Sequence, residues 1–156
     1  MNDEHYIREA IRLAREGMEA GQGGPFGAVI VKDGQIIGQG CNQVLATNDP
    51  TAHAEVVAIR DACQHLGTFQ LEGCTLYTSC EPCPMCLGAI YWARPARIVY
   101  ACLHSDAAQA GFDDHFIYQQ IEKPREQRSI PMHQSHRDEA WTVFEAWMEK
   151  GDKTLY

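Results

Sequence analysis

CTLYTSCEPCPMCLGAIYWARPARIVYAC, residues 74–102, is the stretch that decides the fold. Its two ends, 74–78 and 97–102, are short apolar runs typical of strands. Between them, residues 82–93 are apolar on several sides and long enough for a buried helix. A strand, a helix and a strand in this order form a β-α-β unit with parallel pairing, so the sequence predicts an α/β protein.

Towards the amino terminus, the chain predicts a hairpin and two further helices. Asp33-Gly34 is the dipeptide that most readily forms a primed turn, and apolar runs flank it on both sides. Thr51 is suited to cap a helix, and Gly67 to close it in the left-handed conformation. The expected elements are helices over about 4–20 and from Thr51 to about Leu66, and strands at 28–31 and 35–38.

Beyond residue 102, we expect a short helix over about 113–121, a polar loop at 123–131 and a last helix that ends near Gly151. No repeat or linker divides the chain. The sequence therefore predicts a single domain over 1–156, a three-layer α/β/α sandwich. Its mixed sheet has about five strands, with the two buried helices on one face.

Composition and charge limit the function. The 156 residues are 45% apolar, and the net charge of −8 argues against general nucleic-acid binding, which depends on Lys and Arg. No apolar run is long enough to cross a membrane, and the acidic start does not match a secretory signal. We therefore expect a cytoplasmic protein that acts on a small uncharged molecule.

Two motifs carry the chemistry. TAHAE at 51–55 and CEPCPMC at 80–86 combine H-x-E with P-C-x-x-C, the signature of zinc deaminases. Cys83 and Cys86 are spaced to project from one face of a helix start, and His53 supplies a neutral nitrogen from another helix. We expect these three residues to hold one Zn²⁺ per chain. Three protein ligands leave one position for water, as in catalytic zinc sites.

Glu55 is the expected catalytic residue. It lies two positions beyond His53, too close in sequence to be an easy fourth ligand. It is placed to take a proton from water, give it to a ring nitrogen of the substrate and later protonate the departing amine.

Other interpretations of the cysteines stay open. Cys80 could join the ligands in a closed Cys₃His site, which would make the chain a non-enzymatic, zinc-stabilised module. The open site is favoured because Cys80 lies at a strand end and a structural site does not need Glu55. A redox C-x-x-C does not require His-x-Glu. The remaining cysteines are expected in the core: Cys41, Cys63, Cys74 and Cys102.

On these motifs the chain resembles the cytidine deaminase superfamily, and more closely its purine branch, the bacterial guanine deaminases. The resemblance covers nearly the whole chain but is loose over about 132–139, which leaves the boundaries of the last strand open. The block at 110–114 and the terminal Tyr156 are more specific to guanine deaminases. The matching blocks are 23–34, 48–56, 77–95 and 110–114.

The resemblance implies hydrolytic deamination of guanine to xanthine and ammonia, with attack at purine carbon 2. It further implies that Asn42 binds the purine edge and that Phe26 and Trp92 line the pocket. Asp114 would receive the polar edge beside the amino group, and Tyr156 would cover the pocket. The runner-up is a tRNA adenosine deaminase, against which the acidic balance argues.

The resemblance also implies a homodimer. In it, the C-terminal tail, 151–156, would cover an active site, either its own or the neighbour's through a domain swap. Sequence alone does not distinguish these two arrangements.

Overall fold

The computed structural model describes residues 2–156, which form two units, one ending at His115 and the other spanning Phe116–Tyr156. The first unit contains a four-stranded mixed sheet of order β2-β1-β3-β4. β1 pairs antiparallel with β2 and β3, whereas β3 and β4 pair in parallel, as the β-α-β pattern predicts. The strands are β1 (Gly27–Lys32), β2 (Gln35–Cys41), β3 (Thr75–Cys80) and β4 (Arg97–Cys102).

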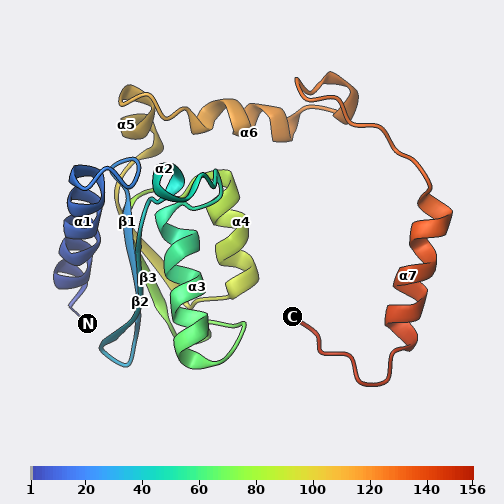
Figure 1. The fold of residues 1–156 in the computed structure, drawn as a ribbon, viewed down its shortest axis with the longest axis horizontal. Coiled ribbons are helices and arrows are strands. Elements are labelled where there is room, and N and C mark those ends of the chain that lie inside the picture. The colour runs from blue at the N-terminus through green and yellow to red at the C-terminus, as the bar shows by residue number, and fades with distance from the viewer. Residues whose placement is uncertain (1) are drawn as a thin grey trace. The chain divides into compact units, whose positions relative to one another are not determined.

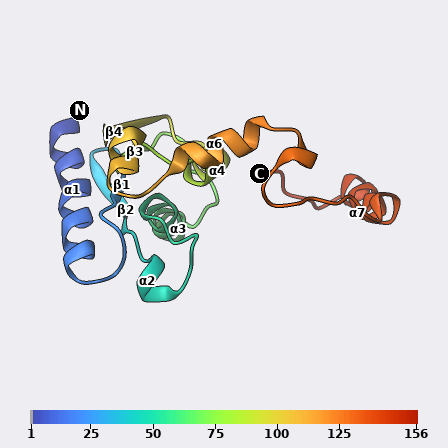
Figure 2. The ribbon, with the colours of Figure 1, turned by 90° about the horizontal axis from the view of Figure 1, so that it is seen from above.

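Helices cover both faces of this sheet. α1 (Asp3–Glu19) lies on one face, and α3 (Ala54–Leu66) and α4 (Pro84–Ala93) lie on the other (Figures 1 and 2). Short helices α2 (Val44–Thr47) and α5 (His104–Gln109) complete the loops, and α6 (Asp114–Glu122) begins at the end of the unit. The α/β/α class is therefore confirmed, with both buried helices on one face.

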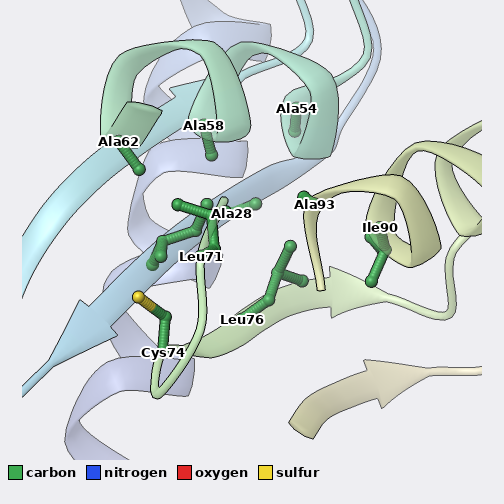
Figure 3. Packing of buried hydrophobic residues seen from close by; sticks show 10 residues of the cluster. Ala28, Ala54, Ala58, Ala62, Leu71, Cys74, Leu76, Ile90 and Ala93 are labelled. Carbon is green, nitrogen blue, oxygen red and sulfur yellow. The ribbon is translucent and has the colours of Figure 1, made fainter. Parts of the chain in front are cut away.

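The core on the α3 side depends on small residues. Ala54, Ala58 and Ala62 point from α3 towards the sheet (Figure 3). A Cβ atom at Gly38 of β2 would lie 2.6 Å from the carbonyl oxygen of Ala58, and one at Gly40 would lie 2.7 Å from that of Ala54. Only glycine permits this approach, so the alanines and glycines fix how closely α3 packs on the sheet. We call these five residues the Gly-Ala seam.

Several local expectations are confirmed. Asp33 and Gly34 both have positive φ, at 49° and 77°, as a primed hairpin turn requires. Gly67 ends α3 in the left-handed conformation. The helix expected from about residue 4 to 20 is α1, and the two strands of the β-α-β unit lie where the sequence placed them.

Other expectations differ from the structure. The N-cap of α3 is His53 rather than Thr51, whose hydroxyl and N–H both donate to Asp49 Oδ1 in a local turn. The sheet of the described residues has four strands instead of about five. Residues 132–136 contain no strand, and α7 (Arg137–Glu149) begins directly after them. A strand forms only where a neighbouring strand accepts its backbone hydrogen bonds, which the residue pattern of 132–139 does not reveal.

The second unit is helical. It contains the remainder of α6, the 3₁₀ turn η1 (Arg125–Gln127) and α7, which confirms the last expected helix. The Arg128 guanidinium donates to the carbonyl oxygens of Gln120 and Ile121 and so closes the loop after α6. No side chain of residues 116–156 is buried, including those of Trp141 and Phe144, which stack on each other. This unit therefore has no core of its own.

Within residues 2–156, every helix is too short or too polar to cross a membrane.

Candidate active site

The three predicted metal ligands meet in the first unit. His53, Cys83 and Cys86 form the one cluster of His, Cys and acidic side chains in residues 2–156 with metal-binding geometry. The Nδ1 atom of His53 lies 3.5 Å from the sulfur of Cys83 and 3.5 Å from that of Cys86. Tetrahedral zinc, with bonds of about 2.0 Å to nitrogen and 2.3 Å to sulfur, places these atoms about 3.5 Å apart. The donor set and its spacing therefore fit Zn²⁺.

Two helix starts position the ligands. His53 is the N-cap of α3, and Cys83 is the N-cap of α4, where its sulfur accepts the N–H of Cys86. Pro84 in the first turn of α4 suits a position where no backbone donor is needed. The partial positive charge of both helix starts favours thiolates at this point.

The charges of the three ligands are coupled. The pKa of Cys83 is lowered, chiefly because the Cys86 side chain donates to its sulfur, with His53 adding a second hydrogen bond. The same contact with Cys83, together with burial, raises the pKa of Cys86. The hydrogen bond with Cys83 also raises the pKa of His53. The hydrogen bonds within the cluster thus favour at least one thiolate among the ligands.

Cys80 lies outside the ligand cluster. Its side chain is buried, and its thiol donates to the carbonyl oxygen of Leu103 at 3.6 Å. Burial raises the pKa of this thiol to about 12, which keeps it neutral. The geometry therefore favours the open three-ligand site over the closed Cys₃His site.

Glu55 lies beside the cluster in the first turn of α3. Only 5% of this residue is exposed, and its Oε1 accepts a hydrogen bond from the Thr78 hydroxyl at 3.1 Å. Burial is the main cause that raises the pKa of its carboxyl group. A carboxyl group whose pKa is raised keeps its proton to higher pH than an exposed one, which suits general acid–base chemistry.

A cavity of about 410 Å³ opens over these residues. It is lined by His53, Glu55 and Cys83 and also by three of the residues expected to bind substrate, Phe26, Asn42 and Asp114. Its walls are mostly apolar with a few polar groups, as in small-molecule sites. The structure therefore brings the metal cluster, the proposed proton carrier and three expected recognition residues to one place.

The polar wall residues are held in defined ways. The Oδ1 atom of Asn42 accepts the N–H of Val44 at 3.1 Å, so the amide nitrogen is the donor that can serve a ligand. The same hydrogen bond closes a local turn, and asparagine is favoured at the start of such a turn. Asp114 begins α6, and its pKa is raised mainly by burial and then by the charge of Cys83.

Two expected substrate residues are not among those that line the cavity. Trp92 lies near the end of α4 and is 64% exposed. Tyr156 ends the second unit and is 68% exposed. Their roles in binding stay predictions.

Sequence reasoning missed several wall residues. Phe112 packs edge to face on Phe26, with the ring centroids 4.9 Å apart, although the block at 110–114 carried no role for it. The unexpected helix α2 brings Val44 and Leu45 to the wall. The glycine-rich loop before Phe26 could have indicated these wall residues, because glycines are favoured where a ligand comes close to the backbone. The other missed residues are Gly23, Gly24, Pro50, Cys80 and Glu81.

Comparison with known proteins agrees with this geometry. Residues 1–102 match the family described as the cytidine and deoxycytidylate deaminase zinc-binding region. The chain belongs to the cytidine and deoxycytidylate deaminase family. As in that zinc-binding family, its His-Cys-Cys cluster is a zinc site, and the chain is a zinc-dependent deaminase.

Within this deaminase family, the chain is similar to the guanine deaminase of Bacillus subtilis. The two are 60% identical over 156 residues, which is 100% of each chain. The X-ray structure of that enzyme superposes with a TM-score of 0.97 over 100% of this chain and 99% of that one. The chain is also similar to the tRNA-specific adenosine deaminase of Aquifex aeolicus, at 44% identity over 66% of this chain and 68% of the relative.

Proposed function

We propose that this deaminase converts guanine and water to xanthine and ammonia. The cavity carries the proposal, because zinc ligands, a buried carboxyl group and polar recognition residues meet in it. The likeness to a guanine deaminase runs through the whole chain, residues 116–156 included. The likeness to a tRNA-specific adenosine deaminase covers two thirds of it, and the net charge of −8 does not suit RNA.

The proposed reaction depends on Glu55. Zinc held by His53, Cys83 and Cys86 would supply an acidified water, the nucleophile that such sites provide near neutral pH. Glu55 takes a proton from this water as its oxygen attacks carbon 2, and gives the proton to the adjacent ring nitrogen. It then takes the remaining proton from the hydroxyl group now on carbon 2 and passes it to the amino group, which leaves as ammonia. The oxygen of water becomes the new carbonyl oxygen of xanthine, so the atoms balance.

The proposed recognition uses the cavity walls. The Asn42 amide donates to an acceptor on the purine edge, and Asp114 accepts from a donor beside the amino group. Phe26 packs against the face or edge of the ring system, since its own ring lines the cavity. We propose that Trp92 also lines the pocket and that Tyr156 covers it.

We also propose that the working form is a homodimer in the cytoplasm. The second unit supports a dimer, because apolar side chains such as Phe144 at 61% exposed and Met148 at 54% exposed lack a core. A neighbouring chain would supply that core, and the tail 151–156 would then cover an active site of one chain or the other. Seven free cysteines suit a reducing compartment.

A screen of free nucleobases tests the proposed function. Purified protein with zinc measured in the same sample is incubated with guanine, adenine, cytosine and a tRNA substrate, and ammonia release or inosine formation is measured. We expect ammonia from guanine above all. Inosine in tRNA without activity on guanine would favour the adenosine deaminase, and zinc without turnover of any substrate would favour a structural module.

A further inference from the structure

Thr78 occupies a buried position of β3 next to Glu55. Its side chain is fully buried, at 0% exposed, and all six residues of β3 are buried. Valine has the same shape and suits a buried strand better, because a buried hydroxyl requires a hydrogen-bond partner. The hydroxyl therefore calls for an explanation at this position.

This hydroxyl has two acceptors and one hydrogen. Its Oγ1 lies 3.1 Å from Oε1 of Glu55 and 2.9 Å from the carbonyl oxygen of Cys80. A hydroxyl group donates one hydrogen bond at a time but can accept others through its lone pairs. It can therefore donate to Glu55, or donate to Cys80 and accept from Glu55.

We propose that Thr78 is a positioning residue that holds the Glu55 carboxyl group in one place beside the substrate cavity. Its hydroxyl joins buried strand β3 to the first turn of α3, at the oxygen Oε1 of Glu55. The carboxyl group is therefore fixed from the side of the sheet, with its orientation set before substrate binds.

The inference rests on the proposed role of Glu55 and deepens it. A fixed carboxyl group matters because proton transfer depends on geometry within hydrogen-bond reach. Thr78 itself lines no part of the substrate cavity, so its effect is expected on turnover and not on binding.

Thr78→Val removes the hydroxyl with little change of shape, and Thr78→Ser keeps it. We expect Thr78→Val to lower kcat about 10- to 100-fold, the size expected from losing a hydrogen bond to a charged group, with KM nearly unchanged. Thr78→Ser should restore most of the activity. Zinc content should stay at that of the parent in both variants.

Ser79 offers a matched control on the same strand. Its buried hydroxyl accepts the N–H of Gly27 at 3.0 Å, so Ser79→Ala also removes a buried hydrogen bond. We expect Ser79→Ala to lower the melting temperature as Thr78→Val does, but to leave kcat close to that of the parent.

A double variant separates action through Glu55 from a general effect. In a Glu55→Gln background, Thr78→Val should cause little further loss, because residues that act together are not additive. If the Thr78→Val variant lost zinc, Thr78→Ala would be used as the test variant in its place. Parent-like kcat, an equal loss in both backgrounds or failure of Thr78→Ser to restore activity would each overturn the inference. These assays use whichever base releases ammonia fastest, so a wrong substrate assignment would not decide the role of Thr78.

Discussion

The thiol of Cys80 donates to the carbonyl oxygen of Leu103 and does not join the ligand cluster, although Cys83 is only three residues further along the chain. We therefore expect Cys80→Ala to retain about one zinc per chain, whereas Cys83→Ala and Cys86→Ala lose it. Zinc is measured by mass spectrometry of the dialysed proteins. Equal loss of zinc in all three variants would show a closed four-ligand site instead.

Glu55→Gln should keep the fold and the zinc but lower turnover by about two to four orders of magnitude, because the proton carrier alone is removed. Steady-state ammonia release and zinc content are measured on the same preparation. Near-normal turnover with full zinc would remove Glu55 from the mechanism.

Asp114→Ala should sharply reduce deamination of guanine and leave zinc unchanged, because a buried donor of the purine would lose its acceptor. Asp113→Ala is the matched control, since Asp113 is exposed and lies outside the residues that line the cavity. If both variants matched the parent, Asp114 would be only a helix-start carboxylate.

Deletion of residues 153–156 should leave secondary structure and zinc intact but strongly reduce guanine turnover, because a water-excluding cover is lost. Lys153 donates to the carbonyl oxygens of Met148 and Lys150 at the end of α7. A shorter deletion of 154–156 keeps these contacts and separates the effect of the last three residues, Tyr156 included, from the loss of Lys153. Unchanged kinetics in both truncated proteins would show that another segment closes the pocket.

If the cover comes from a neighbouring chain, specific activity should fall on dilution below the dimer dissociation constant. The oligomeric state is followed by analytical ultracentrifugation over the same concentrations. Activity that is independent of concentration while the dimer dissociates would argue for closure within one chain.

The Asp3 carboxylate should contribute a pH-dependent part of stability. Hydrogen bonds from Tyr77 and Arg97 hold its pKa below the ordinary value, so the contribution is present above about pH 4 and is lost as pH falls through the lowered pKa. Asp3→Asn should therefore lower the urea midpoint at pH 7 slightly, and the difference should shrink in acid. A Tyr77→Phe background should reduce the effect, and a difference independent of pH would contradict this origin.

Local signals made much of the fold predictable. Asp33-Gly34 and Gly67 require backbone conformations that few other residues adopt, so they marked a turn and a helix end directly. The zinc ligands were equally predictable from the sequence, since a helix start fixes the spacing of Cys83 and Cys86. These features depend on a few neighbouring residues.

Features that depend on distant partners were not predictable in the same way. Thr51 is a good capping residue, but Asp49 accepts a hydrogen bond from its hydroxyl, and the N-cap of α3 is His53, two residues later. Phe112 has no helical or strand periodicity and reaches the cavity only through its packing on Phe26. The boundaries of the last strand, which the loose match over 132–139 left open, depend on a pairing partner that these residues do not specify.

The Gly-Ala seam has a consequence for how this enzyme can change over evolution. It fixes the height of α3 above the sheet, and α3 carries both His53 at its cap and Glu55 in its first turn. Even one added methyl group at Gly40 would displace that first turn. The loop before Phe26 is close-packed as well, since a Cβ atom at Gly23 would lie 2.1 Å from Oδ1 of Asn42. A substitution at either glycine of the seam is therefore expected to disturb a metal ligand and the proton carrier together, so this half of the site can change only if both are repositioned at once.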